Sequence, residues 1–239
     1  MLLNGYVHHG ENLPKSLNFF RSIVIQEFAH RFNSNDAFIK FAKAIVNRSC
    51  GQLQEFSYEG WNTTTHLSYV ADQPNMLKRL QLENSSFHDA NALVRIVKQF
   101  KFPLLVELEL RNIKVSKEDI IKIGSSCQQL KNFWLIKRRE LRRRFSERTD
   151  DDEASTIAES MPQLCRLTLQ ENHMTNDGLQ AILDGCPQLE YLDLLHCYRI
   201  NLETKFITQC LEGIKDARLL NDPIFLNDRI LSPLNFVFL

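Results

Sequence analysis

A pattern of three apolar residues that returns at a nearly fixed interval constrains the fold of this chain more than any other feature. The spacing within the pattern is L-x-x-L-x-L. Two adjoining copies are Leu164, Leu167 and Leu169, followed by Leu189, Leu192 and Leu194. The residues between the copies have the apolar periodicity of a short helix, which is expected to end at Gly185, just before Pro187. Each unit is therefore predicted to contain a strand, a turn and a short helix.

Further copies of the pattern extend over most of the chain. They are Leu53, Phe56 and Tyr58; Leu77, Leu80 and Leu82; Leu105, Leu108 and Leu110; Leu130, Phe133 and Leu135; and a weaker set of Ile214, Ala217 and Leu219. This is the pattern of a leucine-rich repeat, in which a single unit cannot bury its own apolar face and neighbouring units must stack. The sequence predicts an α/β leucine-rich-repeat solenoid of about six to seven repeats, with a curved parallel sheet on the concave side and helices on the convex side.

The residues outside the array divide the chain into segments. We expect residues 1–35 to form an N-terminal helical segment, because apolar residues between Leu17 and Phe32 follow a helical period. Residues 36–220 form the predicted repeat domain, in which Ser116 and Asp119 have the spacing of a helix capping box. Residues 221–239 lose the pattern, and we interpret them as either a cap over the end of the array or a tail.

One interval between repeats is longer than the others. It contains residues 137–153, KRRELRRRFSERTDDDE, in which a basic block is followed by an acidic one. Insertions in repeat proteins go to loops on one face, so we expect an exposed loop between the fourth of the predicted strands and its helix. Two interpretations remain open: a solvated loop that partly neutralises itself, or a nuclear-localisation or phosphate-binding patch.

Composition excludes several classes of protein. The 239 residues carry 29 basic and 29 acidic side chains, so no net charge directs the chain to nucleic acid or to an anionic membrane. No apolar stretch approaches the roughly 20 residues of a membrane-spanning helix. The first residues do not read as a secretory signal. The six cysteines contain no C-x-x-C pair, which argues against a zinc ribbon or a thioredoxin-type site. Several recur at one repeat position, as small buried residues do, so we expect a reduced, intracellular set of thiols and a location in the nucleus or cytoplasm.

Residues that could carry chemistry are scattered. None of the seven histidines lies in an H-E-x-x-H motif, and no glycine-rich phosphate-binding loop is present. Cys197 follows a predicted strand at a position where the repeat favours a small buried residue, so we expect it in the core. No metal or cofactor is expected, and the chain is predicted not to be an enzyme.

A binding surface is predicted instead on the concave face of the sheet. Because strand side chains alternate between two faces, the residues between the buried positions should point to the concave side. The predicted partner-binding residues are Arg79, Glu107, Glu109, Arg111, Trp134, Ile136, Arg166, Gln170, Tyr191 and Asp193. The same face should carry Glu55, Ser57, Glu59, Gln81, Glu83, Asn132, Thr168 and Leu195.

Within this surface, exposed aromatic side chains are the candidate anchors. We hypothesise that Trp134 and Tyr191 anchor a protein ligand, because aromatic residues dominate binding hot spots. Glu107 and Glu109 would then set the charge preference. The alternative for Trp134 is that the insertion folds back and covers it.

Four stretches resemble the plant F-box/leucine-rich-repeat proteins of the subfamily that includes the SKP1-interacting partners. They are NRSCGQL at 47–53, IGSSCQQLKNFWL at 123–135, AESMPQLCRLTLQENHMTNDGLQAILDGCPQLEYLDLLHC at 158–197 and EGIKDARLLND at 212–222. The resemblance covers roughly residues 37–222. It implies that the repeats hold a target protein for ubiquitin transfer, while an F-box docks on SKP1 in a cullin-containing ligase, with no active site in the chain itself.

The N-terminal part departs from that family. Leu13-Pro14 begins like an F-box, but Lys15 does not continue the L-P-x-[DE] motif and no tryptophan precedes Asp36. We therefore expect the F-box to be lost, truncated or diverged. Two functions remain open: a substrate-recognition component of an SCF-type E3 ubiquitin ligase, and a stand-alone adaptor that binds a protein without SKP1. In either case we expect a monomer within a hetero-complex. A fragment of an extracellular repeat receptor is disfavoured, since its L-x-G-x-I-P pattern is absent.

Overall fold

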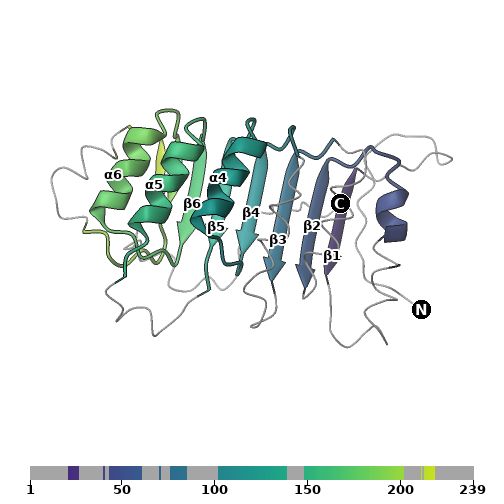
Figure 1. The fold of residues 1–239 in the computed structure, drawn as a ribbon, viewed down its shortest axis with the longest axis horizontal. Helices are drawn as coiled ribbons and strands as arrows, with labels where there is room; N and C mark the ends of the chain where they lie inside the picture. Colours follow the sequence, from purple (N-terminus) through teal and green to yellow (C-terminus); the bar gives the residue numbers. More distant parts are fainter. Residues whose placement is uncertain are drawn as a thin grey trace.

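The computed structural model describes residues 21–26, 40, 43–60, 70, 76–84, 102–138, 148–201, 211 and 213–218. Within these residues the chain forms one open sheet of eight parallel strands that follow one another in sequence order (Figure 1). The strands are β1 (Ser22–Gln26), β2 (Glu55–Gly60), β3 (Arg79–Asn84), β4 (Glu107–Arg111), β5 (Asn132–Ile136), β6 (Arg166–Gln170), β7 (Tyr191–Asp193) and β8 (Asp216–Arg218). The predicted α/β leucine-rich-repeat fold is confirmed.

Equivalent apolar residues of the repeats lie side by side in this sheet. Those that follow one another in register from β3 to β7 are Leu80, Leu108, Phe133, Leu167 and Leu192. All five are fully buried. Because side chains alternate along a strand, this register fixes one face of the sheet as core and leaves the intervening side chains on the other face.

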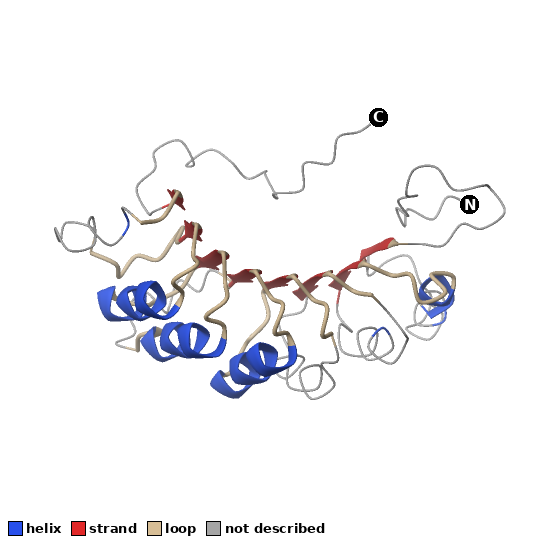
Figure 2. Cartoon of the chain, turned by 90° about the horizontal axis from the view of Figure 1, so that it is seen from above, coloured by secondary structure: helices blue, strands red, loops and turns tan. Residues whose placement is uncertain are grey.

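Three of the helices have bounds within the described residues, and they cover the core face (Figure 2). They are α4 (Lys117–Ser126), α5 (Asp151–Ser160) and α6 (Asn176–Gly185). Figure 2 shows the sheet as a bent ribbon with these helices along its outer side. The predicted capping box begins α4: Asp119 N donates to Ser116 Oγ (3.2 Å), and Ser116 N donates to Asp119 Oδ2 (2.9 Å). The helices pack closely, and a Cβ on Gly124 would lie only 2.3 Å from the carbonyl oxygen of Ser160.

At one repeat position, a residue in the left-handed backbone conformation, with positive φ, turns the chain away from the sheet. Asn112, Glu171 and His196 each lie two residues after the last apolar residue of a triplet, with φ values of 55°, 54° and 65°. In the β5 repeat the same position is Lys137, where the long insertion leaves the sheet. The insertion therefore begins where the β4, β6 and β7 repeats have this turn.

The predicted N-terminal helical segment is wrong at residues 22–26, which form β1 in parallel pairing with β2. Ile23 and Ile25 are buried while Val24 points to the opposite face, which is strand alternation. The repeat array therefore includes residues before Asp36 and has one strand more than the triplets predicted. The remainder of residues 1–35, and all of residues 221–239, lie outside the described residues.

The predicted exposed loop at 137–153 is wrong at both ends. Asp151–Glu153 form the first turn of α5. The side chains of Lys137 and Glu153 contact each other and are only 15% and 14% exposed. Residues 139–147, which hold most of the basic block, lie outside the described residues.

Candidate functional site

Every residue predicted to bind a partner lies on the concave face, in one of three rows that run across the strands. The first row holds Ser22, Glu55, Arg79, Glu107, Asn132, Arg166, Tyr191 and Asp216. The second row holds Val24, Ser57, Gln81, Glu109, Trp134, Thr168, Asp193 and Arg218. The third row, near the C-terminal ends of the strands, holds Gln26, Glu59, Glu83, Arg111, Ile136 and Gln170.

Hydrogen bonds link neighbouring strands along the first row. Arg79 Nε contacts Glu107 Oε2 at 2.5 Å, and Asn132 Nδ2 donates to Glu107 Oε1 at 3.1 Å. On the two strands before β3, Ser22 Oγ donates to Glu55 Oε2 at 3.1 Å. The Arg79 side chain is 44% exposed, so solvent weakens its ion pair. Glu107, one of the predicted charge-setting residues, is thus held in place by its neighbours on both sides.

Carboxylates gather where the second and third rows meet. Glu109 pairs with Arg111, and Asn112 Nδ2 donates to Glu83 Oε1 at 3.3 Å. Burial raises the pKa of Glu83; repulsion by Glu59 and Glu109 raises it further, while Arg111 lowers it. Glu83 is therefore influenced by two neighbouring carboxylates and by one guanidinium group, that of Arg111.

Strands β2, β3 and β4 together form what we call the acidic half of the concave face. Its charged side chains are Glu55, Glu59, Glu83, Glu107 and Glu109 against Arg79 and Arg111. These are five carboxylates and two guanidinium groups, a formal excess of three negative charges. On β5 to β8 the charges balance, with Arg166 and Arg218 against Asp193 and Asp216.

Trp134 borders the acidic half on β5, between Glu109 of β4 and Thr168 of β6. Its side chain is half-buried, and Ile136 points to the same face two residues later. Among the described residues none forms a hydrogen bond with the Trp134 indole. An aromatic surface with an unused N–H donor is suited to binding an extended peptide.

Tyr191, the second predicted anchor, does not lie open to a partner. Its side chain is only 7% exposed. The guanidinium carbon of Arg166 lies 4.1 Å from the ring centroid, and that of Arg218 lies 5.7 Å from it. Cation–π contacts with neighbouring strands therefore occupy the aromatic ring. The expectation of an exposed Tyr191 is wrong, because alternation gives the direction of a side chain but not the neighbours that cover it.

Asp193 contacts the hydroxyl group of Tyr191 and is almost fully buried. It accepts hydrogen bonds from Gln170 Nε2 (3.2 Å), from the Tyr191 hydroxyl (3.5 Å) and from Leu195 N (3.0 Å). Burial raises the pKa of Asp193, whereas its bonds to Leu195 and Gln170 lower it. Asp193 and Gln170, both predicted partner-binding residues, thus contact each other and hold the C-terminal strands together.

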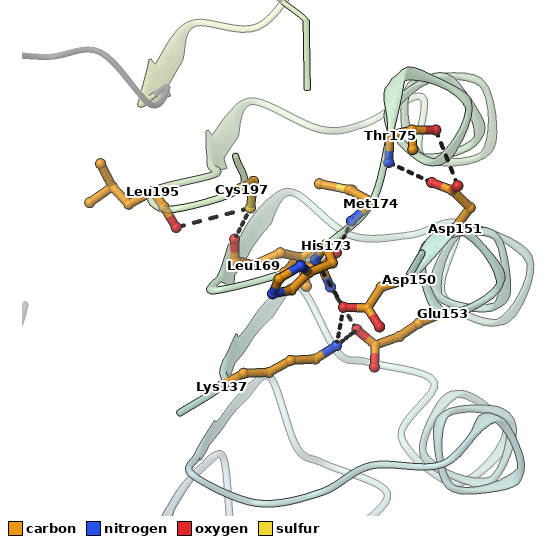
Figure 3. A network of polar contacts seen from close by, with 11 residues as sticks. Lys137, Asp150, Asp151, Glu153, Leu169, His173, Met174, Thr175, Leu195 and Cys197 are labelled. Atoms are coloured by element: carbon orange, nitrogen blue, oxygen red, sulfur yellow. Dashed lines mark hydrogen bonds and ion pairs between the residues drawn. The ribbon is translucent and has the colours of Figure 1, made fainter. Parts of the chain in front are cut away.

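A polar network at the base of the insertion was not predicted (Figure 3). Lys137 Nζ lies 2.9 Å from Asp150 Oδ2 and 2.8 Å from Glu153 Oε1. Asp150 Oδ2 also accepts from His173 N (2.8 Å), and Glu153 Oε1 accepts from Asn172 Nδ2 (2.7 Å). Burial raises the pKa of Glu153, and Lys137 partly offsets this. The network joins the residue after β5 to the start of α5 and to the residues that follow β6; the reversal of charge within 137–153 was its one sequence signal.

The buried cysteines are part of the core, as expected for Cys197. Its Sγ donates to the carbonyl oxygen of Leu169 at 2.9 Å (Figure 3). Burial raises the pKa of Cys197 and Cys127 to about 12, and that of Cys186 to about 11. These thiols are therefore protonated and unreactive at neutral pH.

The described residues contain no group of three or more His, Cys, Asp or Glu side chains placed to hold a metal ion. In the same part of the chain, no helix has the length and apolar character needed to cross a membrane.

Comparison with known proteins gives matches over most of the chain. The family profile for the LRR repeats of the FBD-associated F-box protein At5g56370 matches residues 141–213. F-box/LRR-repeat protein 22 of Arabidopsis thaliana is 41% identical over 180 residues, which cover 74% of this chain and 56% of that protein. F-box protein SKIP19 of the same organism is 35% identical over 179 residues, which cover 75% of this chain and 56% of that protein. The chain therefore spans about half the length of these relatives.

A solved structure shows the same fold at low sequence identity. The crystal structure of a Bacteroides fragilis protein is 10% identical to this chain, with a TM-score of 0.52 over 87% of this chain and 68% of that one. At this identity the similarity concerns the fold alone.

Proposed function

Because the leucine-rich repeats of this chain belong to the family of plant F-box/leucine-rich-repeat proteins, we propose that the chain is a protein-binding module that recognises substrates for an SCF-type E3 ubiquitin ligase. The observation that carries the proposal is 41% identity to F-box/LRR-repeat protein 22 over 74% of this chain. The role is one of binding rather than catalysis, and its proposed place is the nucleus or the cytoplasm.

The concave face supports a binding role. Its three rows present Trp134, Ile136 and the charged side chains of β2 to β4 on a sheet whose opposite face is closed by the core. Side chains of this kind, arranged on a rigid curved surface, are what repeat proteins use to bind extended partners. The target protein is therefore expected on this face, in one-to-one contact with a single chain.

SKP1 and, through it, a cullin are the proposed partners that would link the chain to the ligase. The relatives that carry this part of the proposal include the F-box proteins SKIP19 and SKIP1. Purified chain and SKP1 should co-elute in size-exclusion chromatography. Substitution of Trp134 by Ala should leave this co-elution unchanged, because in this proposal the concave face binds the target and not SKP1.

A stand-alone adaptor is the second candidate, and one structural observation favours it. Residues 22–26 form the sheet strand β1, whereas an F-box is a helical module. An adaptor would bind the target without SKP1 and could compete with full-length relatives. Absence of SKP1 binding at micromolar concentrations, together with retained target binding, would favour the adaptor.

Imaging of a tagged chain in plant cells tests the proposed location in the nucleus or the cytoplasm.

A further inference from the structure

We propose that the concave face takes a basic, extended segment of its protein partner, with cationic side chains over the acidic half and an apolar side chain against Trp134. This inference rests on the proposed binding role and specifies the chemistry of the partner. It follows from the distribution of charge, from the way the carboxylates are paired, and from the spacing between strands.

The distribution of charge is uneven along the face. The acidic half carries three more negative than positive charges, whereas the strands from β5 to β8 are balanced. A cationic segment would therefore be attracted to β2, β3 and β4 and not to the opposite end. A nucleic acid or an acidic peptide would be repelled from the same place.

The pairing of the carboxylates shows where an added cation would be most favourable. Glu107 and Glu109 each have an arginine of this chain as a partner. In the third row Glu83 lies between Glu59 on β2 and Arg111 on β4, and Glu109 lies on β4 in the second row. A cation above Glu83 would offset the repulsion by Glu59 and Glu109, which adds to burial, the main cause of the raised pKa of Glu83.

The spacing between strands relates the cations to an apolar side chain. Neighbouring strands lie about 4.8 Å apart, so Trp134 on β5 is about 14 Å from β2 across the face. In an extended peptide, side chains at i and i+4 point the same way and lie about 13 Å apart, with i+2 between them. A segment with basic residues at i and i+2 and an apolar residue at i+4 therefore matches the acidic half and Trp134 together.

Synthetic peptides provide the test with the full chain. The probe is a fluorescein-labelled peptide whose central sequence is Lys-Ser-Lys-Ser-Phe, followed by fluorescence anisotropy at low ionic strength. The controls carry Glu-Ser-Glu-Ser-Phe and Lys-Ser-Lys-Ser-Ser at the same positions. We expect the first peptide to bind, the acidic control to show no binding, and the control without phenylalanine to bind about tenfold more weakly.

Variants of the chain locate the site. The double substitution E83Q/E109Q should weaken binding of the basic peptide about tenfold and reduce its dependence on salt. Trp134→Ala should weaken binding of the basic peptide that contains phenylalanine. It should leave binding of the basic control without phenylalanine unchanged. Glu159→Gln is the matched control, because it removes an exposed carboxylate from α5 on the convex side. Circular dichroism melting of each variant checks that the fold is retained.

Three results would overturn the inference: no binding of the basic peptide, equal binding of the acidic peptide, or equal weakening by E83Q/E109Q and E159Q. The proposed function has a separate readout in SKP1 binding. A chain that binds SKP1 but no basic peptide contradicts only the present inference. A chain that binds the basic peptide through Glu83 and Glu109 but does not bind SKP1 contradicts only the ligase proposal.

Discussion

Leu108 shows what a single residue contributes to the array. It lies on β4 between Leu80 and Phe133 in the register, and its side chain is fully buried. Replacing Leu108 by Ala removes buried methyl groups and leaves a cavity between sheet and helices, which should lower the free energy of unfolding by about 2–5 kcal/mol. Ile121→Ala, at a position that is 48% exposed on α4, should cost about 0.5 kcal/mol or less. Urea denaturation measures both, and similar losses would contradict the assigned core.

The single residue Glu153 makes the free energy of unfolding depend on pH. Burial raises its pKa above the ordinary value of 4.5, although Lys137 partly offsets the effect. The folded state therefore holds the Glu153 proton more tightly than the unfolded state. The resulting stabilisation is complete below pH 4.5 and is lost as the pH rises through the raised pKa of the folded state.

Substitution of Glu153 by Gln isolates this effect. The free energy of unfolding of the wild-type chain, relative to that of E153Q, should decrease as the pH rises from below 4.5 towards neutrality. Urea denaturation at a series of pH values measures the difference. A difference that stays constant, or that grows with pH, would show that the carboxyl group is not buried as described.

At the scale of elements, the packing of α4 against α5 depends on a glycine. Alanine has the higher helix propensity by about 1 kcal/mol, so Gly124→Ala would stabilise an isolated helix. In the folded chain the added Cβ would meet the backbone of Ser160 at 2.3 Å. We expect a net loss of about 1–3 kcal/mol, because the helices would have to move apart. Ser125→Ala, exposed on the same helix, is the control, and a stabilised G124A would contradict the close packing.

The strand β1 gives a second prediction at this scale. On a strand, Ile25 is buried and Val24 points to the opposite face. Ile25→Ala should therefore lower the free energy of unfolding by about 2–5 kcal/mol, while Val24→Ala should cost about 1 kcal/mol or less. Thermal or urea unfolding of the two variants distinguishes the strand from a helix. A larger cost at Val24 than at Ile25 would favour the helical segment that the sequence predicted, because its apolar face holds Val24.

The strand β1 also shows what could and could not be predicted from the sequence. The triplets from Leu53 onward predicted their own strands, because alternation within the strand and a regular interval agree. Residues 20–25, F-R-S-I-V-I, have the same triplet spacing, but 33 residues separate Phe20 from Leu53 and the apolar run also fits a helix. Local periodicity could not choose between the two, and pairing with β2 decided for the strand.

The sequence predicted the direction of the side chains in the candidate site but not how far each one is exposed. Alternation placed all of the predicted residues on the concave face. It could not show that Arg166 covers the ring of Tyr191, or that Lys137 pairs with Glu153. Both contacts depend on long, flexible side chains that reach into a neighbouring repeat or across a loop. Such contacts have no fixed separation in the sequence.

For the whole molecule, the order of the strands determines how far a local change spreads. Each strand pairs only with its neighbours in sequence, so the stability of the array should be close to a sum of contributions from adjoining repeats. Leu192 on β7 lies six strands from β1, which corresponds to about 29 Å. A change at Leu192 should therefore leave the first strands unaffected.

Hydrogen exchange on Leu192→Ala tests this prediction. The substitution removes a fully buried side chain next to α6, so the amides of Cys186 and Leu189, bonded to Ile182 and to Cys186, should exchange faster than in the wild-type chain. The amides of Glu55 and Arg79, which donate to Arg21 and Gln54, should keep their protection. Equal loss of protection at both ends would show a single cooperative unit. Local loss would mean that the acidic half can stay ordered for its partner while the opposite end opens.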